Sequence, residues 1–273
     1  MPRARRVGAD ARLVLWIRRS IPESPRYLAI SGRAAEAKEI LARVAVANDR
    51  PVSERDLIAG ERRGGATVAN LWIPRLRRST LMLWIAWFCI ALAYYGLFTW
   101  LPSAFVERGF SSLQTYQNTF VLALAQLPGY FSAAYLIERW GRRNTLGLYL
   151  LASGVFTFLF AVASGFRWIL ASAILMSFFS LGAWAALYAW TPELYPTEIR
   201  TTGMGWASGM ARVAGIVAPT LGGILFGLAA TSTGSLLNVL SLWTVAFVIG
   251  GLAVFLLGVE TRRRALFDTV VES

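Results

Sequence analysis

The sequence predicts an all-α membrane protein with six transmembrane helices, and its composition and apolar runs carry this prediction. Of the 273 residues, 56% are hydrophobic and only 15% are charged, whereas about 25% of an ordinary soluble domain is charged. Disorder is excluded as well, because it requires low hydrophobicity together with high net charge. Six long apolar runs follow one another from Thr80 onward, each close to the ~20 residues that a helix needs to cross ~30 Å of hydrocarbon.

The six apolar runs define the predicted spans and divide the chain into three parts. We place the spans at residues 80–101, 116–137, 145–163, 168–190, 204–228 and 236–258. Buried helices of soluble proteins are rarely this long and this apolar, and six in series are rarer still. The bundle at 80–258 is therefore preceded by a segment at 1–79 and followed by a tail at 259–273.

Basic residues fall almost entirely on one side of the predicted bundle. If the spans alternate, 24 Lys and Arg lie on one side, Arg108 and Arg167 lie on the other, and Arg212 lies within a span. Because Lys and Arg favour the cytoplasmic side, we expect both termini in the cytoplasm. Most of the net charge of +12 is then an orientation signal, and no nucleic-acid partner is expected. Arg outnumbers Lys 26 to 1, a bias typical of GC-rich bacterial genomes, and this predicts the inner membrane.

Residues 1–79 contain no stretch long enough to span a membrane. The apolar residues 13–17 are too few for a signal peptide, and no small-residue cleavage site follows them. The sequence at 32–46 places Ile40, Leu41 and Val44 on one side of a helix, which predicts an amphipathic cytoplasmic helix. We expect an exposed loop at 48–65.

The residue inventory excludes several kinds of catalytic and metal site. The chain has no His, and hence no His-dependent triad, His-ligated haem or His-containing metal site. Its single cysteine, Cys89, permits neither an internal disulfide nor a thiolate cluster. The predicted spans contain no Asp or Glu, which excludes an intramembrane aspartyl dyad. We therefore expect no enzyme activity, no cofactor and no metal.

Four short motifs lie at the predicted cytoplasmic edges of the spans. They read PESPR at 22–26, ERWGRR at 138–143, PELYPTEIR at 192–200 and GVETRRR at 258–264. In this order and at these boundaries they resemble the sugar-porter-like branch of the major facilitator superfamily. The tracts ALAQLPGYFSAAYLIERWGRR at 123–143 and SGMARVAGIVAP at 208–219 are most similar to the niacin and aromatic-acid transporters of that branch.

The resemblance implies the C-terminal six-helix half-bundle of a major facilitator fold. The six spans are similar to helices seven to twelve, and residues 11–21 are similar to the end of a missing sixth helix. It implies a secondary transporter that works by alternating access. The glutamine pair of true sugar porters is absent from 80–101, and GVETRRR stands where PETKGR is usual. We therefore expect a small organic anion as substrate, with a sugar or other neutral solute as the alternative.

Charged residues of the motifs predict a cytoplasmic gate. Gly141 allows a tight turn between two spans, and acidic residues on the same side can accept the arginines beside it. Exposed ion pairs contribute only ~0–1 kcal/mol each, but a network can shift a balanced two-state equilibrium. We choose Arg139 and Glu193 as the pair to test; positive-inside anchoring alone is the alternative. The predicted gate residues are Glu138, Arg139, Gly141, Arg142, Arg143, Glu193, Arg200 and Glu260.

Arg212 is the one charged residue within a predicted span. Placing Arg near the bilayer centre costs ~2.5–3.5 kcal/mol even on the lenient insertion scale, so it requires a partner or an aqueous cavity. The partner is an acid in the missing half, a substrate carboxylate, or backbone carbonyls at the kink that Pro219 permits. We expect Arg212 to contact substrate, and a carbonyl-bonded structural Arg is the alternative.

Aromatic and amide side chains complete the predicted substrate site. In the resembling fold, the first and fourth helices of each half line the central cavity, which implicates Tyr94, Tyr95, Trp184 and Tyr188. Their ring faces suit an aromatic solute, although Tyr and Trp equally serve core and interfacial positions. Gln126 lies mid-span, shortly before Pro128, and is the sixth predicted contact.

Six spans supply only half of a two-bundle cavity, so we expect a missing N-terminal six-helix half as a partner, besides a small-molecule substrate and the bilayer. Proton coupling is compatible with this scheme, but its acidic carrier would belong to the missing half, because the spans have none. Two alternatives stay open: a truncated fragment that is inactive alone, and a non-transporting membrane scaffold.

Overall fold

The computed structural model describes residues 21–49, 67–228 and 232–262, and the chain separates into two compact units. All regular secondary structure in these ranges is helical. The first unit contains α2 (Pro25–Ile30) and α3 (Ala34–Ala47), and the second contains the six long helices. The predicted end of a missing helix and most of the loop expected at 48–65 lie outside the described residues.

The two short helices of the first unit follow directly from their sequence. Pro25 opens α2, where its fixed φ suits the first helical turn and its missing N–H costs nothing. Gly32 then turns the chain with φ +79°, a left-handed conformation that favours glycine. The helix predicted at 32–46 is present as α3, and an ion pair between Arg33 and Glu36, 2.6 Å apart, links its first turn to the turn before it.

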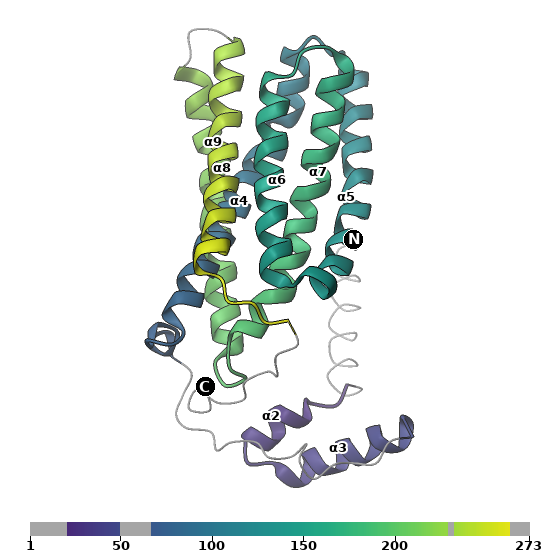
Figure 1. The fold of residues 1–273 in the computed structure, drawn as a ribbon, viewed down its shortest axis with the longest axis vertical. Helices are drawn as coiled ribbons and strands as arrows, with labels where there is room; N and C mark the ends of the chain where they lie inside the picture. The colour runs from purple at the N-terminus through teal and green to yellow at the C-terminus, as the bar shows by residue number, and fades with distance from the viewer. Residues whose placement is uncertain (1–20, 50–66, 229–231, 263–273) are drawn as a thin grey trace, which may run out of the picture. The chain divides into compact units, whose positions relative to one another are not determined.

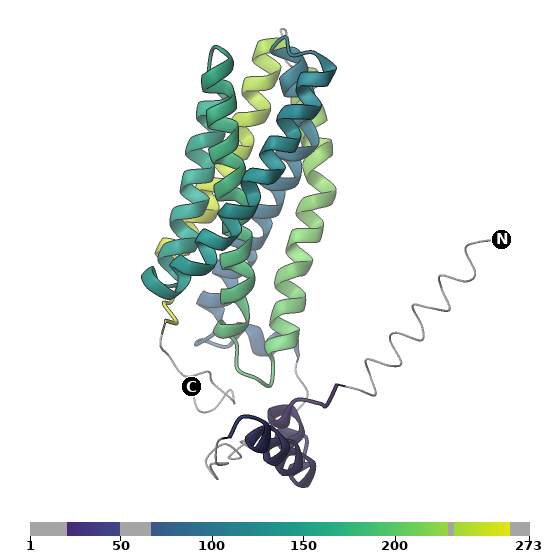
Figure 2. The ribbon, with the colours of Figure 1, turned by 90° about the vertical axis from the view of Figure 1, so that its right-hand side faces the viewer.

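Six helices in the second unit are long and apolar enough to cross a membrane, as the sequence predicts. They are α4 (Arg77–Glu107), α5 (Ser112–Trp140), α6 (Arg142–Val162), α7 (Phe166–Trp190), α8 (Arg200–Leu228) and α9 (Ser232–Leu257). They run side by side along a common direction, as Figure 1 and Figure 2 both show. Most extend past the predicted spans, because the helical hydrogen-bond pattern continues into the polar turns that flank each apolar run. Two short 3₁₀ helices, η2 (Val68–Trp72) and η3 (Thr191–Leu194), flank α4 and α7.

The six helices form a ring that is open on one side. Each packs extensively on the next in the order α5, α7, α6, α9, α4, α8. Within the described residues, no extensive packing joins the two end helices, α5 and α8. Only 22% of the most apolar window of α5 and of α8 is buried, against at least 50% for the other four helices. The open side is therefore bordered by α5 and α8, whose apolar faces have no cover among the described residues.

Two glycines let α5, α6 and α7 cross at close range. A Cβ on Gly129 of α5 would lie 2.1 Å from the carbonyl oxygen of Phe178 in α7. A Cβ on Gly182 of α7 would lie 2.2 Å from the ring of Tyr149 in α6, and 2.8 Å from the carbonyl oxygen of Gly129. Small residues permit such backbone contact between membrane helices, so this crossing fixes the spacing of three helices.

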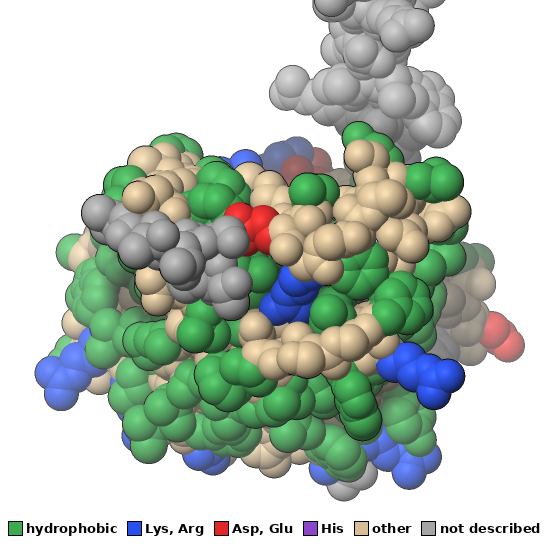
Figure 3. Space-filling view, turned by 90° about the horizontal axis from the view of Figure 1, so that it is seen from above, with side chains coloured by type: hydrophobic (Ala, Val, Ile, Leu, Met, Phe, Trp, Pro, Cys, Tyr) green, Lys and Arg blue, Asp and Glu red, His purple; other side chains and the backbone are tan. Residues whose placement is uncertain are grey.

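Figure 3 views one end of the bundle, where hydrophobic and uncharged groups make up most of the described surface. Arg108 is the C-cap residue of α4. Its guanidinium lies 4.4 Å from the ring centroid of Phe160 and donates to the carbonyl oxygen of Ala161 at 2.9 Å. Burial lowers the pKa of Arg108 from its usual value. The side chain thus ties the end of α4 to the end of α6.

Replacing Gly129 by Ala should destabilise the bundle, although Ala favours helix formation over Gly by ~1 kcal/mol. The added Cβ would collide with the backbone of α7, and overpacking of this kind costs ~1–3 kcal/mol. The matched control is Gly209→Ala in α8, because no atom lies within 4 Å of the Cβ position there. Thermal unfolding of the purified chain, followed by tryptophan fluorescence, measures both. Equal melting temperatures for the two variants would contradict the close crossing.

Candidate functional site

A pocket of about 360 Å³ lies between α4, α7 and α8. It is called the aromatic pocket below, because Trp and Tyr side chains make up much of its wall. Four of the six predicted substrate contacts line it: Tyr95, Trp184, Tyr188 and Arg212. The other lining residues are Trp87, Thr99, Ser208, Ala211, Gly215, Ile216 and Pro219.

The aromatic wall is held in place by ring-to-ring contacts between α4 and α7. Trp87 meets Tyr188 edge-on, with 4.8 Å between ring centroids, and Trp184 stacks on Tyr188 at 5.7 Å. Trp87 is fixed further, because its indole Nε1 donates to the hydroxyl of Thr191 at 3.0 Å. Edge-on and offset-stacked pairs are the favoured aromatic geometries, so the pocket presents ring faces with defined orientations.

Arg212 brings a positive charge to the aromatic pocket. Its side chain is exposed on α8, and within the described residues it has no ion pair and no hydrogen bond. The carbonyl oxygen of Pro219, another residue that lines the pocket, accepts a hydrogen bond from Trp100 at 3.3 Å. In the part of the chain that the structure describes, the guanidinium is therefore available to a solute in the pocket.

Tyr94 and Gln126, the two remaining predicted contacts, do not line the aromatic pocket. The Tyr94 hydroxyl donates to Gln126 Oε1 at 3.3 Å, and Gln126 Nε2 donates to Ser177 Oγ at 3.1 Å. The ring of Tyr94 packs edge-on against Trp184 at 6.0 Å. These two residues thus form part of the support behind the pocket wall.

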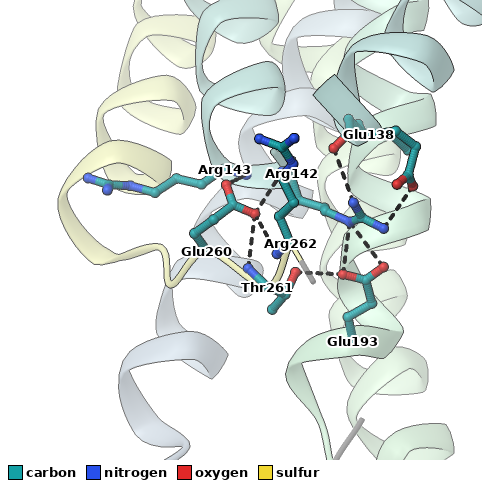
Figure 4. A network of polar contacts seen from close by, with 8 residues as sticks. Glu138, Arg142, Arg143, Glu193, Glu260, Thr261 and Arg262 are labelled. Carbon is teal, nitrogen blue, oxygen red and sulfur yellow. Dashed lines mark hydrogen bonds and ion pairs between the residues drawn. The ribbon is translucent and has the colours of Figure 1, made fainter. Parts of the chain in front are cut away.

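A second cluster of polar contacts joins the adjacent ends of α5, α6, α7 and α9 (Figure 4). Its core is Arg142, whose Nε lies 3.2 and 3.1 Å from the two carboxylate oxygens of Glu193, and whose Nη2 donates to Glu138 at 2.9 Å. The Arg142 and Glu193 side chains are only 13% and 21% exposed, so solvent weakens this pair less than a surface pair. We call this cluster the charged network; it comprises Glu138, Arg142, Arg143, Glu193, Glu260, Thr261 and Arg262.

Glu260 caps the start of α6 from beyond the end of α9. Its carboxylate accepts hydrogen bonds from the backbone N–H groups of Arg142 at 3.0 Å and Arg143 at 3.1 Å. The N-cap residue of α6 is Gly141, which has no side chain that could accept hydrogen bonds from these N–H groups. Gly141 has φ +93°, and a Cβ there would lie 2.2 Å from a Glu260 oxygen. Both the turn and the cap therefore require glycine at this position.

The remaining predicted gate residues lie around this core. Arg143 donates to the carbonyl oxygen of Phe255 in α9, and Arg200 donates to the carbonyl oxygens of Pro192 at 2.8 Å and Tyr195 at 3.2 Å. Arg139 lies over the ring of Tyr135, 5.2 Å from its centroid. Among the described residues, the arginine that pairs with Glu193 is therefore Arg142 and not Arg139, because Arg139 packs on Tyr135 of its own helix.

Two structurally important residues escaped the sequence-based site prediction. Tyr195 is fully buried, and its hydroxyl donates to Thr80 Oγ1 at 3.2 Å, which in turn donates to the carbonyl oxygen of Leu71 at 2.8 Å. Burial raises the pKa of Tyr195, so the hydroxyl stays protonated. Its position within the PELYPTEIR motif is the sequence feature that could have identified Tyr195 as important. Trp87 precedes Tyr94 by seven residues, two helical turns, and that spacing would have placed it on the same face.

Comparison with known proteins identifies the family. Residues 10–270 match the family described as "Sugar (and other) transporter". The chain is 36% identical to the putative niacin/nicotinamide transporter NiaP of Bacillus subtilis over 92% of this chain and 55% of that protein. It is 41% identical to the niacin transporter NiaP of Acinetobacter baylyi, over 78% and 48%. It is 30% identical to the 3-(3-hydroxy-phenyl)propionate transporter of Escherichia coli, over 76% and 51%.

The chain spans about half the length of these curated relatives. The match covers both the six apolar helices and the motifs at their ends. The all-helical architecture agrees with one half of a major facilitator fold. The chain is therefore a multi-pass membrane protein that belongs to the sugar (and other) transporter family of the major facilitator superfamily.

Proposed function

We propose that this chain is the C-terminal half of a secondary transporter that moves a small organic anion, such as an aromatic or nicotinate-like acid, by alternating access. The observation that carries the proposal is the pairing of Arg212 with ring faces in one pocket. A guanidinium binds a carboxylate through charge-assisted hydrogen bonds, and aromatic side chains bind a planar ring. The aromatic pocket offers both to one solute.

The named relatives support the same class of solute. The names of three relatives give niacin, nicotinamide and hydroxyphenylpropionate as solutes, and two of these, niacin and hydroxyphenylpropionate, are aromatic carboxylic acids. Thr99 and Ser208 add hydroxyl groups to the aromatic pocket, and this favours a sugar or other neutral solute as the second candidate. The two candidates differ in whether Arg212 is needed.

The open side of the bundle supports a second six-helix bundle as partner. The faces of α5 and α8 that border it are apolar and largely uncovered, and Gly205 and Gly209 on α8 have no atom within 4 Å of their Cβ positions. Small residues of this kind allow a partner helix to approach closely. We assign this partner to the N-terminal half, so that substrate binds between two halves, and the chain alone is inactive.

The charged network is the proposed cytoplasmic gate, in the orientation that places both termini in the cytoplasm of a bacterial cell. It ties α5, α6, α7 and the tail after α9 together through one arginine. A network that forms in only one conformation shifts the equilibrium between the inward- and outward-facing states. Proton coupling would use an acid outside the described spans.

Arg212→Met should abolish most uptake of nicotinate. The test uses proteoliposomes that contain the chain together with the N-terminal half of the Acinetobacter baylyi relative, and labelled nicotinate as the probe. A charge-assisted hydrogen bond contributes about 1.5–3 kcal/mol, so the half-saturating concentration should rise roughly 10- to 150-fold. Arg167→Met is the control, because Arg167 is an exposed residue that does not line the pocket.

Two outcomes of that experiment would contradict the proposal. Unchanged nicotinate uptake by the Arg212→Met variant would favour the neutral-solute alternative, which uptake of labelled nicotinamide then tests. Uptake by the chain without any N-terminal half would show that a second bundle is not required.

Exchanging the charges of Arg142 and Glu193 should restore transport that either single reversal removes. Each of Arg142→Glu and Glu193→Arg places two like charges opposite each other, where the native ion pair is 3.1 Å long. Uptake should therefore fall about tenfold or more, the effect of ~1.4 kcal/mol on a two-state balance. Recovery in the double variant will be partial, because Arg142 also contacts Glu138 and the carbonyl oxygen of Ile137. The control exchange, Arg139→Glu with Glu193→Arg, should recover nothing. Equal recovery in both exchanges would refute the specific pair.

A further inference from the structure

We infer that Gln126 is a positioning residue that fixes the wall of the aromatic pocket from behind, without contacting the solute itself. Three polar side chains carry this inference: Tyr94 of α4, Gln126 of α5 and Ser177 of α7. Each lies near the middle of its helix, where hydrocarbon surrounds the bundle and supplies no hydrogen-bond partner. The inference rests on the proposed function of the pocket.

The three side chains form one directed chain of hydrogen bonds. The Tyr94 hydroxyl donates to Gln126 Oε1 at 3.3 Å, and Gln126 Nε2 donates to Ser177 Oγ at 3.1 Å. Ser177 Oγ then donates to the carbonyl oxygen of Leu122 at 2.9 Å, one turn before Gln126 on α5. Both ends of the Gln126 amide are thus engaged by protein groups, and an amide so engaged suits a structural bridge better than a direct solute contact.

The bridge crosses a place where helix packing is sparse. Helix α4 packs extensively on α8 and α9 but only lightly on α5 and α7. By contrast, α5 and α7 are locked together three residues beyond Gln126, at the contact of Gly129 with Phe178. The hydrogen bond from Tyr94 therefore adds a tie near mid-helix between α4 and the rigid α5–α7 pair, besides the bond of Trp87 to Thr191 beyond the end of α7.

Tyr94 transmits this constraint to the pocket. Its ring lies edge-on to Trp184 at 6.0 Å and 87°, and edge-on to Tyr95 at 5.7 Å. Trp184 and Tyr95 both line the aromatic pocket. If the hydroxyl of Tyr94 is released, its ring can turn about its side-chain torsions, and the two wall residues lose a fixed neighbour.

The test removes each end of the bond with little change of shape. Gln126→Met keeps an unbranched side chain of similar length, and Tyr94→Phe keeps the ring; the third variant carries both changes. The matched control is Tyr149→Phe, which also removes a hydrogen bond from a tyrosine to α5, here to Ser132 at 2.8 Å. Tyr149 does not line the pocket, so its loss reports on general packing alone.

Two readouts are taken on the purified full chain assembled with the N-terminal half of the Acinetobacter baylyi relative, because the proposed function places the solute between two halves. The first is the ¹⁹F resonance of Trp184 in protein labelled with 5-fluorotryptophan, assigned with Trp184→Phe. It should shift by more than its linewidth in Gln126→Met and in Tyr94→Phe, and stay in place in Tyr149→Phe. The second is the Kd for nicotinate, which should rise about three- to tenfold in either variant, the loss expected for one neutral hydrogen bond. The double variant should show no further rise, because both changes break the same bond.

The two readouts separate this inference from the function on which it rests. A Trp184 resonance that is unmoved by Gln126→Met overturns the positioning role, whatever the Kd. An equal shift in Tyr149→Phe also overturns it, because the effect would then be general packing. If the resonance moves only in the two bridge variants but no form of the chain binds nicotinate, the positioning role stands and the proposed solute is wrong.

Discussion

Hydrocarbon supplies no hydrogen-bond partner, and this one constraint explains where the polar side chains of the bundle lie. Most hydroxyls within the helices satisfy it locally, by donating to a carbonyl one turn earlier on their own helix. Ser153, Thr157 and Ser180 do so at 2.7 Å each. Polar groups that hydrogen-bond to another helix, or that have no hydrogen-bond partner among the described residues, are exceptions to this pattern. Four of them, Trp87, Tyr94, Gln126 and Ser177, lie at the aromatic pocket or behind its wall.

The same constraint explains where the ionised side chains of the bundle lie. Only one ionised side chain, Arg212, lies deep within a described helix away from both ends. The others gather at the ends, and they differ between the two ends. One end holds the charged network, in which a single arginine contacts two acids. The other end relies on aromatic packing and a half-buried arginine bonded to a carbonyl. The two ends of the bundle are therefore closed by different physical interactions.

The sequence predicted the six helices well, because each apolar run has a length that only one structure explains. It also predicted four of the residues that line the aromatic pocket, through the resemblance and the helix on which each lies. It could not show that Gln126 points to Tyr94, because the rotation of a helix that is apolar on most sides leaves no periodic signal. The same limit explains why the sequence predicts Arg139, and not Arg142, as the partner of Glu193. These arginines are three residues apart, and Gly141 between them starts a new helix in a new direction.

The cap on α6 has a consequence for how the bundle assembles. The carboxylate that completes the first turn of α6 belongs to a residue made more than a hundred positions later. During synthesis, before Glu260 has been made, the first backbone N–H groups of α6 can hydrogen-bond only to water or lipid headgroups. Only after α9 has inserted can the segment that follows it cap this end, so Glu260 completes the first turn of α6 once all six helices are in the membrane.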